Sequence, residues 1–358
     1  MSQNLSSPEA QLAALIASVA PTDATYEEAA WARLDSLTKP PRSLGRLEEI
    51  AARVARIQRT DHPAADGKAV LLMAGDHGIV AEGVAPYPQE VTQQMVANFA
   101  AGGAAINQLA ASVGAEVIVY DVGIAGDVSL PGVEVQKVAH GTRNAAAGPA
   151  MTRDEAASAV LVGVAAVREA VARGARVIGT GEMGIGNSTA AAALVAAYTG
   201  LAPSDLVGPG TGLDGAGVSH KAQVVARILQ VNRVDELDAL GVLAAVGGLE
   251  IAALAGVVLG GAAEGVCVIA DGYIAGAAAL AAVRLCPVSA DYVLPSHLSR
   301  EPGHRMLLDA LGMEPLLALD MRLGEGTGAA LAMGIVDAAC RMLSGMATFA
   351  EAGVSTAE

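Results

Sequence analysis

Aromatic residues and cysteines are both scarce in this sequence of 358 residues. One Trp, six Tyr and two Phe make up 3% of the chain, which argues against the aromatic stacking surfaces that bind single-stranded nucleic acid. The three cysteines, Cys267, Cys286 and Cys340, are odd in number and far apart in the sequence. They predict neither a disulfide framework nor a metal cluster, and they suit a protein kept in a reducing compartment.

Basic residues are also few. The chain has 22 Lys and Arg against 37 Asp and Glu, which gives a net charge of −15. Proteins that bind nucleic acid or anionic membranes need a basic surface, because they must neutralise phosphates. We therefore expect no nucleic-acid partner and no membrane partner.

Long uninterrupted apolar runs are missing, although 53% of the residues are hydrophobic. A membrane-spanning helix needs about 20 consecutive apolar residues, and the richest region, residues 242–268, contains Glu250 and Glu264. The first residues, MSQNLSSPEAQ, have neither the basic nor the apolar part of a signal peptide. These features predict a cytoplasmic protein.

Helical patterns occupy the two ends of the chain. Residues 26–37 and 43–58 have apolar residues at helical spacing, with Ser43 as the expected N-cap of the second helix, and a proline-rich break separates them. A further helical stretch is expected at 328–350. We predict that residues 1–65 and 328–358 form a small helical domain, and that residues 66–327 form a larger α/β domain that binds substrate and carries out catalysis.

Short aliphatic runs alternate with glycine-rich loops and alanine-rich helical stretches between these ends. This alternation predicts βαβ units and a mostly parallel, Rossmann-like sheet flanked by helices. In such folds ligands bind at the carboxyl ends of the strands, so the loops after the strands are the candidate site. The expected strands are AVLLMA (69–74), VIVYDV (117–122), RVIGT (176–180), VCVIA (266–270), DYVLP (291–295) and LLALDM (316–321).

The loop GEMGIGNST (181–189) follows an expected strand and opens an expected helix. In this position the backbone N–H groups of Gly184 and Gly186 can bind a phosphate. The loop nearly matches a P-loop, but Asn187 stands where an ATPase or GTPase has its lysine, so we discount those activities. A tight glycine turn without a ligand, in which Ser188 or Thr189 caps the helix, explains the loop equally well.

Two further loops contain candidate residues. GPGTGLD (208–214) includes Thr211 and Gly212 and precedes a helical stretch with Lys221. Its glycines allow close approach to a ligand, although a surface turn with a solvated lysine is the simpler interpretation. LGEGTG (323–328) places Glu325 between glycines at a strand–helix junction. Glu325 either complements the helix dipole or acts as a general base, which requires a dry pocket that raises its pKa.

Histidines give little support for a metal. His77 follows the first expected strand, and HLSREPGH places His297 near His304 with Glu301 between them. The Pro302-Gly303 pair prevents the single-helix geometry of the HExxH zinc motif. We therefore expect no bound metal and no cofactor, and we interpret these histidines as polar loop walls or substrate contacts.

Six segments in this order resemble the nicotinate-nucleotide:dimethylbenzimidazole phosphoribosyltransferase family, which assembles the nucleotide loop of cobalamin. The resemblance runs from about residue 31 to residue 350. The segments are LTKPPRSLGRLEEIA (37–51), AGDHGIVAEGVAPYPQEVTQQM (74–95), GEMGIGNST (181–189), GPGTGLD (208–214), SHLSREPGH (296–304) and LGEGTGAALAM (323–333).

The resemblance implies a pentosyltransferase that forms homodimers. Such an enzyme moves the 5-phosphoribosyl group of nicotinate mononucleotide to 5,6-dimethylbenzimidazole, giving nicotinate and α-ribazole 5′-phosphate. Glu325 matches the family's catalytic base, Glu182 matches a second carboxylate of the site, and Gln93 matches the segment that lines the benzimidazole pocket. We assign the Gly loops and Lys221 to the substrate phosphate.

Two other functions remain open. In a nicotinate mononucleotide hydrolase or phosphatase, Glu325 would activate water in place of an azole. A non-catalytic nucleotide-binding protein would bind nicotinate mononucleotide without turnover. In both cases the segment PYPQEVTQQM (86–95) has no evident purpose, because only one ligand is bound.

Overall fold

A computed structural model describes residues 7–210 and 212–355. These residues contain a six-stranded sheet in the order β3-β2-β1-β4-β5-β6, and every neighbouring pair of strands is parallel. This order is that of the Rossmann fold, so the predicted fold class is confirmed. The strands are β1 (Lys68–Gly75), β2 (Glu116–Gly123), β3 (Val133–Val135), β4 (Val177–Met183), β5 (Cys267–Ala270) and β6 (Val293–Pro295).

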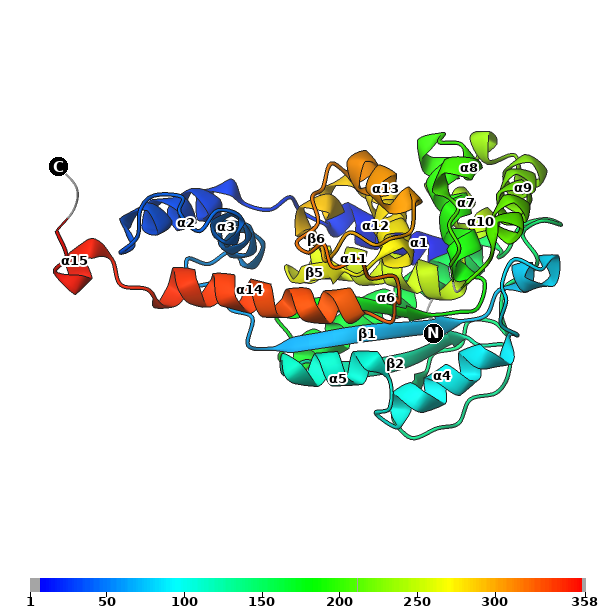
Figure 1. Cartoon of the computed structure of the whole chain (residues 1–358), viewed down its shortest axis with the longest axis horizontal. Coiled ribbons are helices and arrows are strands. Elements are labelled where there is room, and N and C mark those ends of the chain that lie inside the picture. Colours follow the sequence, from blue (N-terminus) through cyan, green and yellow to red (C-terminus); the bar gives the residue numbers. More distant parts are fainter. Residues whose placement is uncertain (1–6, 211, 356–358) are drawn as a thin grey trace, which may run out of the picture.

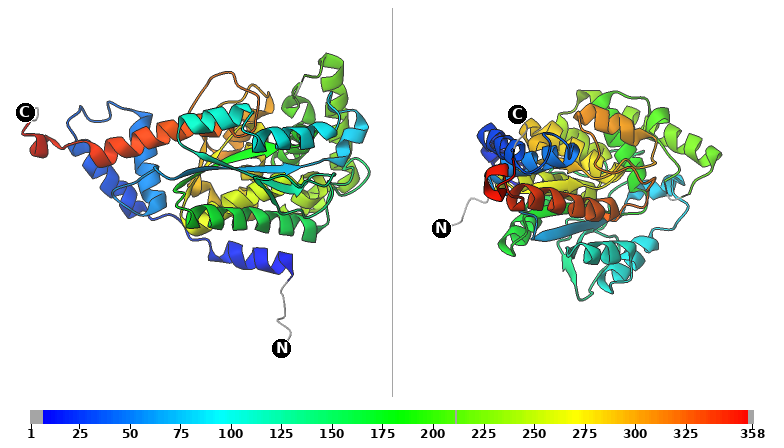
Figure 2. Two further views of the ribbon diagram at one scale, coloured as in Figure 1. Left: turned by 90° about the horizontal axis from the view of Figure 1, so that it is seen from below. Right: turned by 60° about the vertical axis from the view of Figure 1, so that its left-hand side comes forward.

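Helices cover both faces of the sheet (Figures 1 and 2). The α-helices are α1 (Pro8–Ser18), α2 (Ala24–Ser36), α3 (Arg46–Gln58), α4 (Glu90–Ala100), α5 (Ala105–Ser112), α6 (Arg153–Ala172), α7 (Asn187–Thr199), α8 (Pro203–Leu206), α9 (Gly215–Asn232), α10 (Ala239–Val246), α11 (Leu249–Glu264), α12 (Tyr273–Leu285), α13 (Gly303–Leu311), α14 (Thr327–Gly345) and α15 (Phe349–Ala352). Short 3₁₀ turns are η1 (Gly78–Glu82), η2 (Val234–Glu236) and η3 (Pro287–Tyr292).

The central strand β1 separates two apolar cores. Its residues alternate between them: Leu71 and Met73 join the core formed with α6, α7, α11 and α12, whereas Val70 and Leu72 join the core formed with α3, α4, α5 and α14. Successive side chains of a strand point to opposite faces, so a strand that is apolar at every position requires cover on both sides. This explains why the sequence shows continuous apolar runs.

Five of the six predicted strands are present, with ends that differ by a few residues. The prediction for residues 316–321 is wrong: this segment forms only an isolated bridge between Leu317 and His297, and Leu319 is 55% exposed. Conversely, the three-residue edge strand β3 was not predicted, because it is short and the side chain of Glu134 between its two valines is exposed.

The terminal helices partly follow the prediction. Helix α3 packs against α2 and α14, and Arg33 on α2 donates to the carbonyl oxygen of Leu343 at 2.9 Å. Ser43 is not the N-cap of α3, because residues 41–45 form a turn and the helix begins after Gly45. The predicted helix 328–350 is broken at Met346, and Thr348 caps the short helix α15.

Helix α1 lies apart from α2 and α3. It packs against α6 and α11 on the opposite face of the sheet, and Figure 2 shows it beyond that layer. The division into residues 1–65 with 328–358 and residues 66–327 stays a prediction.

Among the described residues, α14 is long and apolar enough to cross a membrane by length and composition. Half of its apolar window is buried inside the protein, where it packs against α3, α5 and β4. A core helix passes the same test, and this packing is that of a core helix.

Candidate active site

A pocket of about 690 Å³ lies at the carboxyl ends of the central strands. The strand order reverses direction between β1 and β4, and the loops after these strands diverge there, which leaves the crevice where Rossmann folds bind ligands. The pocket is lined from three of the predicted loops and from the ends of β4 and β5. Its polar lining includes Glu182, Asn187, Ser188, Lys221, Asp271, His297, Ser299, Glu301, Arg322 and Glu325.

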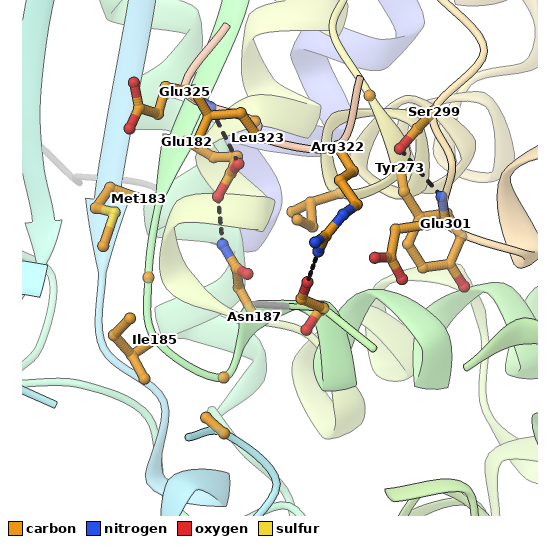
Figure 3. A pocket seen from close by; sticks show the side chains of 18 of the residues that line it. Glu182, Met183, Ile185, Asn187, Tyr273, Ser299, Glu301, Arg322, Leu323 and Glu325 are labelled. Carbon is orange, nitrogen blue, oxygen red and sulfur yellow. Dashed lines mark hydrogen bonds between the residues drawn. The ribbon is translucent and has the colours of Figure 1, made fainter. Parts of the chain in front are cut away.

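Glu182 and Glu325 come together on one side of this pocket (Figure 3). Glu182 lies near the end of β4, and one of its carboxylate oxygens accepts a hydrogen bond from the side-chain amide of Asn187, the first residue of α7. The other oxygen accepts from the backbone N–H of Glu325, with a distance of 3.3 Å. The loop after β4 and the loop before α14 are therefore joined through a single carboxylate.

Glu325 has an unusual backbone. Its φ of +63° is left-handed, and so are those of its neighbours Gly324 at +83° and Gly326 at +91°. Oε2 of Glu325 is buried and has no hydrogen-bond partner among the described residues. A buried carboxylate oxygen without a hydrogen-bond donor is uncommon in proteins.

Burial changes the pKa values of both carboxyl groups. It raises the pKa of Glu182 to about 8, against the opposing effect of the Asn187 hydrogen bond. It also raises the pKa of Glu325, and the negative charge of Asp271 adds to this effect while a hydrogen bond from the Ile106 backbone opposes it. A carboxylate with a raised pKa is a stronger base, as general-base catalysis near neutral pH requires.

Cationic side chains lie at another part of the same pocket. Lys221 on α9 is 1% exposed and donates to Oγ of Ser188 at 2.8 Å, and burial lowers its pKa to about 8. Arg322 donates to the carbonyl oxygen of Gly210 at 2.8 Å and joins two loops. Figure 3 shows Arg322 between the carboxylates and a group formed by Tyr273, Ser299 and Glu301.

Most predicted site residues meet in the pocket, but not all. Gly184, Gly186 and Asn187 line it together with Lys221 and both glutamates. Gln93 does not line it: the side chain is exposed on α4 and donates to the carbonyl oxygen of Asp127 at 3.1 Å. Gly212 lies in the turn beside Pro209 and outside the lining, and Thr211 lies outside the described residues.

The histidines have separate environments. His77 is buried beneath the pocket, where Nε2 lies 2.5 Å from Oε1 of Glu250. Burial alone would lower the pKa of His77, but the Glu250 carboxylate outweighs it and the pKa is raised. His304 accepts from the Ser299 backbone at 2.8 Å, and burial lowers its pKa to about 3. His297 lines the pocket. Within the described residues, no three His, Cys, Asp or Glu side chains are grouped as metal ligands.

Several lining residues were missed at the level of sequence. Asp271 directly follows β5, and this position at the carboxyl end of a strand was the available signal. Ser299 and Glu301 belong to the SHLSREPGH segment that carried the resemblance. Glu301 was considered there only as a metal ligand beside the two histidines, and Ser299 was not considered. Arg322 precedes the LGEGTG loop, and nothing local distinguishes it from a solvated arginine.

The fold and the site together define an α/β enzyme whose pocket combines buried carboxylates, a buried lysine and glycine loops at helix N-termini. A model of the phosphoribosyltransferase family matches residues 19–354. Two nicotinate-nucleotide–dimethylbenzimidazole phosphoribosyltransferases are each 51% identical to this chain: that of Desulforamulus reducens covers 96% of this chain and 99% of its own length, and that of Geobacter metallireducens covers 95% and 96%.

A solved structure agrees with these relatives. The crystal structure of nicotinate-nucleotide–dimethylbenzimidazole phosphoribosyltransferase from Thermus thermophilus is 50% identical and superposes with a TM-score of 0.89 over 94% of this chain and 100% of that chain. This chain is an enzyme of the phosphoribosyltransferase class. Within that class it belongs to the nicotinate-nucleotide–dimethylbenzimidazole phosphoribosyltransferase family.

Proposed function

We propose that this enzyme transfers the 5-phosphoribosyl group of nicotinate mononucleotide to 5,6-dimethylbenzimidazole, with Glu325 as general base. One ring nitrogen of the benzimidazole attacks C1′ of the ribose. The bond from C1′ to nicotinate breaks, and its electron pair neutralises the positive pyridinium nitrogen. The proton on the other benzimidazole nitrogen passes to Glu325, which leaves α-ribazole 5′-phosphate and nicotinate.

The observation that supports this proposal most directly is the shared pocket of Glu182 and Glu325. Glu325 offers a buried carboxylate oxygen without a partner among the described residues, as a base that must meet an azole N–H requires. A positioned base contributes about 10²–10⁴-fold to the rate of a proton transfer. The names of the relatives supply the substrates, and this pair of carboxylates supplies the chemistry.

Glu182 has a complementary role in the proposal. The ribosyl centre gains positive charge as nicotinate leaves, much as in glycoside hydrolysis. A pKa of about 8 keeps Glu182 protonated at neutral pH in the protein alone, but a cationic pyridinium nucleotide nearby favours its ionised form. Substrate binding would thus ionise the carboxylate that stabilises the transition state.

The rest of the pocket suits the two substrates. Its apolar wall is a suitable surface for a flat, methylated aromatic base; it comprises Val84, Ala85, Tyr87, Val91, Met95, Met183 and Ile185. The 5′-phosphate is assigned to the loop that begins α7 and to Lys221. Backbone N–H groups at a helix N-terminus and one buried ammonium can hold a phosphate without a basic protein surface.

The decisive experiment is a turnover assay with nicotinate mononucleotide, with and without 5,6-dimethylbenzimidazole. Nicotinate and the ribosylated base are measured for the wild type, for Glu325→Gln and for Glu28→Gln, a control at an exposed glutamate on α2. We expect nicotinate release only with the base present, a loss of about 10²–10⁴-fold in Glu325→Gln, and no change in the control.

The other outcomes separate the alternative functions. Nicotinate release without the benzimidazole would identify a hydrolase, and binding of the nucleotide without any turnover would identify a sensor. Full activity in Glu325→Gln would leave the transferase reaction standing but remove the assigned base.

A homodimer in the cytoplasm is also part of the proposal, on the strength of the family resemblance alone. Sedimentation velocity tests the assembly, with an expected mass of twice the chain mass of 35.6 kDa. A species at the mass of one chain at all concentrations would contradict it.

A further inference from the structure

The left-handed turn around Glu325 needs support from its surroundings. Three successive residues, Gly324, Glu325 and Gly326, have positive φ, and for a residue with a side chain this conformation is unfavourable. Strained conformations of this kind persist only where neighbouring groups fix them.

Asp271 binds the turn on its helical side. It follows β5, is 2% exposed and directs both carboxylate oxygens at the start of α14. Oδ2 accepts from the backbone N–H of Gly326 at 3.3 Å, and Oδ1 accepts from the backbone N–H of Ala329 at 2.9 Å. One buried side chain thus caps the first turn of a long helix and fixes the residue that follows Glu325.

Asp271 is enclosed by groups of the neighbouring loop and helix. Nδ1 of His297 lies 4.0 Å from Oδ1 of Asp271, and the Ser296 hydroxyl donates to the Asp271 carbonyl oxygen at 2.6 Å. A Cβ atom added at Gly328 would lie 2.0 Å from Nδ1 of His297 and 2.9 Å from Oδ1 of Asp271. The carboxylate and the helix are in contact across a position where only glycine fits.

We propose that Asp271 is the positioning residue of the reaction: by binding the N–H groups of Gly326 and Ala329, it holds Glu325 in the left-handed turn that presents its carboxylate to the acceptor base. This inference rests on the proposed role of Glu325 as the general base. Asp271 acts through the backbone, and Glu325 receives the proton.

The charge of Asp271 gives the role a signature that a purely structural residue lacks. Glu325 is faced by Asp271 after β5, by Glu182 on β4 and by the Ile106 backbone on α5, and Asp271 is faced by His297. The negative charge of Asp271 raises the pKa of Glu325. The same charge raises the pKa of Glu182. Removing it lowers both pKa values, so the acid limb set by Glu182 and the lower acid limb set by Glu325 both move to lower pH.

The test compares Asp271→Asn and Asp271→Ala with Asp238→Asn, which removes a helix-capping carboxylate from α10, outside the pocket. We expect kcat to fall about tenfold in Asp271→Asn and about 10²-fold in Asp271→Ala, because small displacements of a catalytic group have effects of this size. The KM for nicotinate mononucleotide should stay within about twofold of the wild-type value, and the acid limb should move down in Asp271→Asn. The control variant Asp238→Asn should leave kcat, KM and the acid limb unchanged.

A double-variant cycle separates this inference from the proposed function. If Asp271 acts through Glu325, Asp271→Asn has no further effect on the residual rate of Glu325→Gln. If Asp271→Asn lowers the rate of Glu325→Gln by the same factor as it lowers the wild-type rate, the positioning role is overturned. An unchanged kcat in Asp271→Asn would overturn it as well. Wild-type activity in Glu325→Gln alone would instead overturn the base assignment.

Ser296→Ala is a milder variant that tests the same geometry if the Asp271 variants fail to fold. It removes the hydroxyl that donates to the Asp271 carbonyl oxygen and keeps the charge. We expect a fall in kcat of about threefold with the acid limb unmoved. An unchanged kcat in a folded Ser296→Ala protein would contradict the proposal.

Discussion

At Glu182 and Lys221, burial moves two pKa values toward each other from opposite sides. It raises the pKa of the carboxyl group to about 8 and lowers the pKa of the ammonium group to about 8. Both groups change charge close to physiological pH, although neither residue type normally does so. The two charges that the proposed reaction uses therefore coexist over only a narrow range of pH.

Glu182→Gln should change the pH profile of kcat/KM. Glu182 is ionised above its pKa of about 8 and Lys221 is protonated below its own, so the wild type should show a bell-shaped profile with its maximum near pH 8. The substitution should remove the acid limb near pH 8, leave the lower limb of Glu325, and reduce kcat by about 10²-fold. Steady-state rates from pH 5 to 10 provide the measurement, and an acid limb that stays near pH 8 would assign it to another group.

The sequence could predict which loops form the site but not where each side chain points. Parallel strands end at one edge of the sheet, which correctly placed Glu182 at the end of β4. Glu325 was expected there after a strand at 316–321 that does not form, yet the loop before α14 brings it into the same pocket. Gln93 is different, because it lies on a helix. Val91 and Met95, four residues apart, occupy the face of α4 that lines the pocket, and a residue midway between them points elsewhere. The orientation of that helix depends on tertiary packing.

At the scale of the element, α6 and α11 make an unusually close contact. A Cβ atom added at Gly256 would lie 1.9 Å from the carbonyl oxygen of Val160, and one added at Gly163 would lie 1.8 Å from that of Ala253. Backbones that approach this closely exclude even a methyl group. The abundance of Gly and Ala lets the two helices pack with their backbones in contact.

Gly256→Ala and Gly334→Ala form a matched pair that tests this packing. Both glycines lie inside helices, where alanine is intrinsically favoured. At Gly334 the new methyl group meets only Val113 at an ordinary 3.5 Å, so the free energy of unfolding should rise by about 0.4–1 kcal/mol. At Gly256 it meets backbone, and the free energy should fall by about 1–3 kcal/mol. Urea denaturation measures both, and equal effects would disprove the close contact.

The two segments whose strand structure was predicted wrongly, residues 316–321 and β3, are short and lie at the edges of the sheet. Residues 316–321 have the composition of a strand, but they pair with the loop after β6 through single bonds such as that from the Leu317 N–H to the Ser296 carbonyl oxygen. An apolar segment forms a strand only where a neighbouring strand is present to pair with it. The sequence does not show that β6 already ends at Pro295. The central strands β1, β2 and β4 are long and buried on both faces, and for that reason their sequences were sufficient.

At the scale of the whole molecule, α14 connects the site to the terminal helices. Its first residue follows the Glu325 turn, its middle is tied to β1 by the ion pair of Lys68 and Asp337 at 2.9 Å, and near its end the Leu343 carbonyl oxygen accepts from Arg33. A helix of 19 residues is about 28 Å long. The same rigid element therefore belongs to the main sheet and to the group formed with α2 and α3 (Figure 1).

This sharing of α14 predicts that the terminal helices and the sheet unfold together. Trp31 on α2 is the sole tryptophan, so its fluorescence follows the terminal helices, while far-ultraviolet circular dichroism follows the whole protein. We expect the two thermal transitions to coincide within about 2 °C, as in a two-state transition. An earlier transition of Trp31 fluorescence would show that the terminal helices form an independently unfolding unit.

The left-handed backbone at Glu325 also has a consequence for how the chain can change over generations. Glycine adopts this conformation freely, so folding alone would favour glycine at position 325 over glutamate. Selection for stability therefore acts against the present residue, and the proposed role of Glu325 as general base supplies the opposing selection. In a duplicated gene that is no longer selected for this reaction, replacement of Glu325 by glycine would therefore not reduce stability. A relative with glycine at this position would be expected to keep the fold and to lack the proposed reaction.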